Sequence, residues 1–206
     1  MFITFEGPEG AGKSSQIKLL ASRMAENGKK VLTTREPGGT GLGGQLRSMV
    51  LSPEINVSLI TEVLLYAADR AQHVAEVIVP AVEDGYIVLC DRHIDSFIAY
   101  QCFGRGVNYA FISELNRWAG TRPDITFLLD VPLEVSRQRM SSRGTLLDRV
   151  ELEGDAFHER VRQGYLAIAE GEPDRVRVFD GTLDLNTLHE KIYQTIMSLL
   201  SSNSPL

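Results

Sequence analysis

Short apolar runs rich in β-branched and aromatic residues alternate along this chain with longer stretches of helical periodicity. The runs that we expect to form strands are residues 2–5, 31–34, 86–90, 125–131 and 176–179. Most are apolar without regular alternation, which is typical of strands buried on both faces of a sheet. Strands that alternate with helices predict parallel pairing through right-handed crossovers. We therefore expect an α/β fold of three layers, with a five-stranded parallel sheet and helices on both faces.

Helical spacing is clearest in two stretches. Residues 58–79 carry a stripe of apolar residues, and so does the C-terminal stretch; the members are Ile60, Val63, Leu64, Ala67, Ala71, Val74 and Ile78 in the first, and Leu188, Ile192, Ile196 and Leu199 in the second. Each stripe predicts a helix that packs on the sheet. Residues 35–44, 101–108 and 140–154 break the rhythm and are expected to be loops near a ligand, beyond the carboxyl ends of the strands.

Composition limits the class of protein. The 206 residues, 43% of them apolar and 23% charged, predict a single globular domain over residues 1–206. The net charge of −6 argues against a non-specific nucleic-acid binder. Two cysteines, Cys90 and Cys102, are too few for a disulfide framework. The chain has no apolar run of about 18 residues and no signal-peptide pattern at its start, so we expect a cytoplasmic protein without a membrane partner.

A phosphate-binding motif follows the first predicted strand. Residues 7–14 match G-x-x-x-x-G-K-[ST] in full; the predicted ATP-binding residues are Gly7, Pro8, Glu9, Gly10, Ala11, Gly12, Lys13, Ser14 and Ser15. The glycines let backbone N–H groups approach phosphate oxygens, and the helix that follows adds further donors. Lys13 supplies charge for the outer phosphates, and the Ser14 hydroxyl is a candidate ligand for Mg²⁺. Strand, loop and helix together predict a P-loop NTPase fold.

The phosphate loop by itself does not separate a kinase from a regulatory GTP switch. No Asp in this chain is followed by Gly three residues later, and no Asn-Lys-x-Asp tetrad is present to read guanine. Both absences favour ATP over GTP. A nucleoside or nucleotide kinase is therefore favoured over a GTP switch, but this motif does not show which acceptor such a kinase would use.

Two further patterns point to an acceptor that carries phosphate and a base. Asp91 and Arg92 directly follow the predicted strand 86–90. Asp91 is a candidate for the metal site and Arg92 for a phosphate clamp. A surface ion pair at the strand end is the alternative interpretation. Tyr66, Arg70 and His73 lie at i, i+4 and i+7 of the helix 58–79. A ring beside an arginine suits a planar base, although a solvated helix face gives the same pattern.

Arginines gather around the third irregular segment. Arg137, Arg139, Arg143 and Arg149 flank Gly144. A mobile arginine segment at about 140–154 would close over two nucleotides as a lid and neutralise charge on a transferring phosphoryl group. A basic, solvated helix end is the alternative.

These motifs together resemble those of bacterial thymidylate kinases, which belong to the nucleoside monophosphate kinases. The resemblance spans nearly the whole chain. It rests on the phosphate loop with Glu9 at its third position, on R-E-P-G-G-T (35–40), L-L-Y-A-A-D-R-A-Q-H (64–73), D-R-H-I-D-S-F-I-A-Y-Q (91–101), P-D-I-T-F-L-L-D-V (123–131) and F-H-E-R-V-R-Q-G-Y (157–165). R-E-P-G-G-T and D-R-x-I-D-S are more specific than the phosphate loop.

The resemblance implies an enzyme that transfers the γ-phosphoryl group of ATP to dTMP with Mg²⁺, and a homodimer. Arg92 and Arg47 would bind the dTMP phosphate, Tyr66 would stack on thymine, and Arg70 would donate to its carbonyl edge. Ser96 and Gln101 would contact the base, and Tyr100 would exclude a 2′-hydroxyl. Glu36 and Glu9 would manage the metal and the acceptor sugar. Because the third loop position is acidic, the catalytic charge would come from the lid, from Arg143 first and then Arg149 and Arg139, beside Lys13.

The chain departs from the family pattern at three positions. His93 follows Asp-Arg where Tyr is usual, Phe97 stands where a small polar residue is common, and Tyr66 replaces Phe. The first two bear on the shape of the base pocket. Tyr66 keeps the stacking face.

Overall fold

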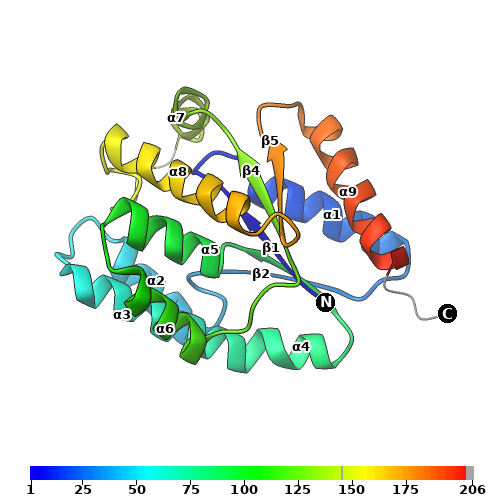
Figure 1. Cartoon of the computed structure of the whole chain (residues 1–206), viewed down its shortest axis with the longest axis horizontal. Helices are drawn as coiled ribbons and strands as arrows, with labels where there is room; N and C mark the ends of the chain where they lie inside the picture. The colour runs from blue at the N-terminus through cyan, green and yellow to red at the C-terminus, as the bar shows by residue number, and fades with distance from the viewer. Residues whose placement is uncertain (145, 203–206) are drawn as a thin grey trace.

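In the computed structural model, which describes residues 1–144 and 146–202, a parallel sheet lies between two layers of helices (Figure 1). The described residues form five strands in the order β2-β3-β1-β4-β5, all parallel. The strands are β1 (Phe2–Glu6), β2 (Val31–Arg35), β3 (Ile87–Asp91), β4 (Ile125–Asp130) and β5 (Val176–Asp180). Each lies within one residue of its expected range. The predicted fold class is confirmed.

Helices connect the strands, and two short π-helices extend them. The helical elements are α1 (Lys13–Glu26), α2 (Gly41–Leu51), α3 (Leu59–His73), η1 (Val74–Ile78), α4 (Val79–Glu83), α5 (Ile94–Phe97), η2 (Ile98–Gly104), α6 (Tyr109–Ala119), α7 (Leu133–Ser141), α8 (Asp155–Gly171) and α9 (Leu185–Ser202). The first half of segment 101–108, which we expected to be a loop, therefore lies in η2, and residues 41–44 of segment 35–44 open α2. Thr40 caps α2 by accepting a hydrogen bond from the Gly43 N–H.

Both faces of the sheet are buried, which explains the unbroken apolar runs. Odd-numbered residues of β1, such as Ile3 and Phe5, pack with α1 and α9. Helix α9 contributes Leu188, Ile192 and Ile196 to this core. On the opposite face, Leu128 packs with α8 and η2, while Val88 and the buried thiol of Cys90 pack with η1 and α4. Figure 1 shows α1 and α9 on one side of the sheet and α3, α4 and α8 on the other.

The apolar stripe expected on residues 58–79 is only partly buried. Val63, Ala67 and Ile78 belong to the core, but Ile60 and Leu64 are half exposed, and Ala71 is exposed as well. The buried face of α3 instead includes four polar residues, Glu62, Asp69, Arg70 and His73. Our prediction of the buried stripe was wrong there because hydrogen bonds and ion pairs, described below, bury polar side chains that a hydrophobic pattern places outside.

Helix α8 and η2 approach each other closely through glycines. A Cβ at Gly164 would lie 2.7 Å from the Phe103 ring, and a Cβ at Gly104 would lie 2.7 Å from the Phe157 ring. This approach packs Tyr165 of α8, which is 2% exposed, into the core with Leu128 of β4 and Ala99 of η2.

We predict that Gly164→Ala lowers the free energy of unfolding by about 1–3 kcal/mol, because the added methyl group overpacks this contact. Chemical denaturation followed by circular dichroism measures the change. Gly171→Ala is the matched control, since a Cβ at this last residue of α8 meets no atom within 4 Å. Equal stability of the two variants would show that the close approach is not needed.

Candidate active site

A cleft of about 1210 Å³ opens along the carboxyl edge of the sheet. It is lined by the phosphate loop, the ends of β2 and β3, one side of α3, and part of the segment 140–154. Among the predicted site residues the lining includes Glu9, Gly10, Ala11, Gly12, Lys13, Ser14, Ser15, Glu36, Arg47, Tyr66, Arg70, Asp91, Arg92, Ser96, Tyr100, Gln101, Arg139 and Arg143. The structure thus brings nearly all of the predicted residues together in one cleft.

The phosphate loop passes from β1 to the first turn of α1. Gly7 has a φ of 134°, and a Cβ there would lie 2.3 Å from the Leu129 carbonyl oxygen, so no other residue fits this close approach. Lys13 folds back so that its Nζ donates to the Gly7 and Pro8 carbonyl oxygens at 3.0 and 2.8 Å. Burial, together with the nearby Arg92, lowers the pKa of Lys13 to about 8. The loop therefore presents a desolvated cation beside backbone donors.

Ser14 and Asp91, the predicted metal pair, meet beside the loop. The Ser14 hydroxyl at the start of α1 donates to Asp91 Oδ2 at the end of β3, over 2.6 Å. A hydroxyl and a single carboxylate fit Mg²⁺, which retains several waters and takes further oxygen ligands from phosphates. Within the described part of the chain, no group of three or more His, Cys, Asp or Glu residues offers a complete protein cage for a metal. The structure thus brings the two residues of the predicted metal pair together beside the phosphate loop.

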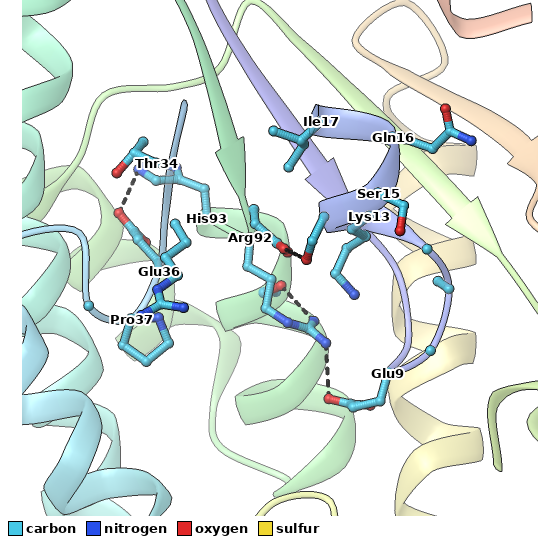
Figure 2. Close-up of a pocket in the computed structure, with 18 of the residues that line it drawn as sticks. Glu9, Lys13, Ser15, Gln16, Ile17, Thr34, Glu36, Pro37, Arg92 and His93 are labelled. Carbon is cyan, nitrogen blue, oxygen red and sulfur yellow. Dashed lines mark hydrogen bonds and ion pairs between the residues drawn. The ribbon is translucent and has the colours of Figure 1, made fainter. Parts of the chain in front are cut away.

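Arg92 leaves the end of β3 and points toward the phosphate loop (Figure 2). Its Nη2 donates to Glu9 Oε1 at 2.9 Å, and the Tyr100 hydroxyl donates to the same oxygen. The guanidinium carbon lies 5.0 Å from the centre of the Tyr100 ring. Burial by itself would raise the pKa of Glu9, but Arg92 and Lys13 outweigh it and lower that pKa. Glu9 is therefore an anion within a cationic cluster.

Glu36 forms the centre of a second buried cluster. Its Oε2 accepts from Arg70 Nε at 2.9 Å, and its Oε1 contacts His73 Nδ1 at 2.9 Å and His93 Nε2 at 3.3 Å. His73 also contacts Thr34 Oγ1 at 2.6 Å. Burial opposes ionisation of Glu36, but His93, Arg70 and His73 outweigh it and lower its pKa to about 2. The carboxylate thus holds Arg70 at the wall of the cleft.

The remaining predicted acceptor residues line the far end of the cleft. Arg47 donates to the Pro37 carbonyl oxygen at 2.9 Å, and burial beside Arg35 lowers its pKa. Tyr66 lies half-buried, with a pKa raised by burial and by the nearby Glu62. Gln101 donates to Glu62 at 2.9 Å, while its own buried carbonyl oxygen has no hydrogen-bond partner within the described structure. This end of the cleft therefore combines an aromatic ring with a buried amide oxygen that has no hydrogen-bond partner among the described residues.

The arginines of segment 140–154 lie in two different places. Arg143 lines the cleft, is 43% exposed and pairs with Glu151. Arg139, near the end of α7, also lines it and donates to the Gly10 and Gly181 carbonyl oxygens. Arg149 is not part of the lining: its Nε donates to the Val50 carbonyl oxygen at 2.8 Å, and its Nη2 lies 2.6 Å from Glu62 Oε2. In this conformation Arg149 is an anchor on α3.

Known proteins resemble this chain over nearly its whole length. A family model described as "Thymidylate kinase" matches residues 5–192. The chain belongs to the thymidylate kinase family. It is 43% identical to the thymidylate kinase of Exiguobacterium sibiricum, with 100% of this chain and 98% of that protein aligned, and 48% identical to that of Trichlorobacter lovleyi over 98% and 99%. The crystal structure of thymidylate kinase from Ehrlichia chaffeensis superposes with a TM-score of 0.78 at 35% identity, covering 96% of this chain and 98% of that one.

In this thymidylate kinase family member, two buried residues behind the cleft were not singled out by our sequence reasoning. Tyr165 comes from α8, and its hydroxyl accepts from Arg92 Nη1 at 2.8 Å. Glu6 ends β1 and is fully buried; burial, with the nearby Asp95, raises its pKa to about 7. One signal was available for each: Tyr165 closes the motif 157–165, and Glu6 is the acidic end of an otherwise apolar run.

His93, which departs from the usual family residue, gives a pH prediction. Burial, with Arg70 and His73 nearby, lowers its pKa from 6.5 to about 3 even though Glu36 opposes the change. Between those values the unfolded chain binds a proton that the folded chain does not, so stability falls as pH falls. From pH 7 to 5 this loss amounts to about 1–2 kcal/mol, and His93→Phe should remove it.

Urea unfolding of the wild type and the variant at both pH values measures the difference. The raised pKa of Glu6 acts in the opposite direction, stabilising the fold as pH falls toward 4.5, so only the change between variants is diagnostic. His189→Phe, at a half-buried imidazole on α9, is the control and should keep most of the pH dependence. The same dependence in all three proteins would contradict the assignment.

Proposed function

We propose that this protein is a thymidylate kinase that transfers the γ-phosphoryl group of ATP to dTMP and yields ADP and dTDP. The observation that carries the proposal is that Lys13, at the start of α1, and Arg92, directly after β3, line the same cleft (Figure 2). Glu9 of the phosphate loop pairs with Arg92 there. Phosphoryl transfer needs little covalent help from a protein. It needs two phosphates held in line and charge stabilised on the moving group.

The donor would lie on the phosphate loop, residues 7–15. The backbone of Gly7 to Gly12 and the start of α1 would bind the phosphates, and Lys13 would leave its carbonyl partners to contact the outer ones. Ser14 and Asp91 would hold Mg²⁺, which when bound neutralises phosphate charge. A dTMP phosphate oxygen is already anionic at neutral pH, so no general base is required.

The acceptor would lie toward α3. Arg92 and Arg47 would bind its phosphate, Tyr66 would stack on the base, and the free oxygen of Gln101 would accept from a base N–H. Arg70, Ser96 and Tyr100 would complete the pocket around base and sugar. Glu36 would keep Arg70 in place, and Glu9 would lie between the sugar and the loop.

We also propose that residues 1–206 are one kinase domain whose segment at about 140–154 acts as a lid; Thr145 within it lies outside the described residues. Arg143 is the first candidate to reach the transferring group, since it lines the cleft and, among the described residues, its side chain pairs with Glu151 while remaining 43% exposed. Arg149 would need to leave Glu62 to act in this way. These proposed substrates imply a cytoplasmic location.

A second copy of this chain is the partner that we propose. Helices α2 and α3 pack side by side and expose apolar side chains, namely Met49, Leu59, Ile60 and Leu64, each between 42% and 50% exposed. This face has the composition of a subunit interface. No helix in the described part of the chain is long and apolar enough to span a membrane.

The function is tested by ADP release across a panel of nucleoside monophosphates and thymidine. We expect dTMP to be the best acceptor and thymidine to be used poorly, because only dTMP engages Arg92. Lys13→Ala should lower turnover about 10²–10³-fold, while Lys29→Ala, an exposed lysine outside the cleft, should not. Robust use of thymidine would favour a nucleoside kinase. Tight GTP binding without transfer would favour a nucleotide switch.

The partner is tested by light scattering after gel filtration. We expect a mass near twice the 22.8 kDa of one chain, and a shift toward one chain in Leu64→Glu, because a charge would be buried in the interface. Val178→Glu is the matched control: Val178 is 50% exposed on β5, the edge strand farthest from β2 in the sheet order. A wild-type mass of one chain would refute the dimer.

A further inference from the structure

Glu6 is a buried acid that the proposed chemistry does not use. It lies one residue before the phosphate loop, is 0% exposed and does not line the cleft. In the described structure no arginine or lysine forms an ion pair with it at a distance below 4 Å. A carboxyl group buried without a direct cation is costly unless its oxygens accept hydrogen bonds. The groups that bond to it therefore indicate its role.

The first of its oxygens fixes the backbone around Arg92. Arg92 has a φ of 72°, a left-handed conformation that residues with a side chain rarely adopt. Two backbone N–H groups hold it there. The Arg92 N–H donates to the Phe5 carbonyl oxygen at 3.0 Å, and the His93 N–H donates to Glu6 Oε1 at 2.7 Å. Neighbouring residues of β1 thus support the turn that directs the Arg92 side chain.

The second oxygen orients two hydroxyls that contact the guanidinium. Ser96 Oγ donates to Glu6 Oε2, and the Tyr165 hydroxyl lies 3.3 Å from the same oxygen. Arg92 Nη1 donates to both, at 3.2 Å to Ser96 and 2.8 Å to Tyr165. The Tyr165 hydroxyl also lies 2.7 Å from Ser96 Oγ. A hydroxyl has one hydrogen, so Ser96, which donates to Glu6, and Tyr165, which donates to Glu6 or to Ser96, both keep lone pairs for the guanidinium. An amide NH₂ in its place would reverse that polarity.

The result leaves part of Arg92 available to a ligand. Of its five N–H donors, the described structure uses two on Nη1 and one on Nη2, the latter with Glu9. The other two remain for an anion in the cleft. An arginine held in one orientation loses less entropy on binding a phosphate than one that is free to rotate.

We propose that Glu6 is a positioning residue that holds Arg92 in the orientation in which it binds the phosphate of the acceptor. It acts through the His93 N–H on the backbone and through Ser96 and Tyr165 on the side chain. This inference rests on the proposed function, in which Arg92 is the acceptor clamp.

The test is a double-mutant cycle on steady-state kinetics, with dTMP and ATP each varied at saturating levels of the other. Glu6→Gln keeps the shape of the side chain and should raise the KM for dTMP about tenfold, the effect of one misdirected charge-assisted hydrogen bond, with the KM for ATP within about twofold. In an Arg92→Ala background, Glu6→Gln should change the KM for dTMP by less than about twofold, because the group on which it acts is absent.

Two variants separate positioning from general damage to the fold. Asp95→Asn alters another buried acid, 1% exposed, whose bonds go to Arg175 and Thr126 instead of Arg92; it should lower the melting temperature without a selective rise in the KM for dTMP. Tyr165→Phe removes one hydroxyl only. It should raise the KM for dTMP in the Arg92 protein and not in Arg92→Ala, and it serves if Glu6→Gln fails to fold.

Each other outcome counts against the proposal. An unchanged KM for dTMP in Glu6→Gln, equal rises for both substrates, or the same rise in both backgrounds would overturn the role of Glu6. If Arg92→Ala alone leaves the KM for dTMP unchanged, the clamp and its positioning both fall. Failure of the proposed function is distinct, because the wild type would then not use dTMP at all.

Discussion

The parallel pairing of β1 with β3 is the constraint on which this site depends. Its register places Phe5 opposite Asp91, so the phosphate loop and the Asp91–Arg92 turn leave the sheet side by side. Pairing of β2 with β3 places Arg35 opposite Asp91 and so brings Glu36 to the same edge. In open parallel sheets this is the edge where ligands bind, because the loops diverge there. Residues almost 80 positions apart, Ser14 and Asp91, meet for this reason.

Charged side chains are also concentrated at this edge of the sheet, where they are buried away from solvent. Glu6, Lys13 and Glu36 are each less than 8% exposed, and each is satisfied by partners that the strands fix in place. In such surroundings electrostatic interactions are stronger than in water, and unpaired groups are more costly. The acids here keep cations and hydroxyls in defined orientations before any substrate arrives. This is the preorganisation that phosphoryl transfer requires.

The sequence was sufficient where local patterns determine the outcome. Buried strands appear as apolar runs, and the phosphate loop is contiguous, so β1, β3 and the position of Lys13 followed directly. The burial of α3 could not be predicted in this way, because a hydrophobic pattern cannot show that Arg70 and His73 are buried by bonding to Glu36. Tyr165 was missed for a related reason. Its partner Glu6 lies 159 residues away, and the packing of α8 on η2, α5 and β4 brings them together.

The arginines of segment 140–154 show how a single contact separates residues that look alike in the sequence. Arg143 and Arg149 both flank the same glycine, and composition alone gives them equal standing. Arg149 bonds to Glu62, which lies one turn before Tyr66 on α3 and also bonds to Arg105 and Gln101. Because a buried ion pair is costly to break when one partner leaves, this end of the segment is tied to the acceptor side of the cleft. Among the described residues, the Arg143 side chain pairs with Glu151 of its own segment, and this pair is not tied to α3.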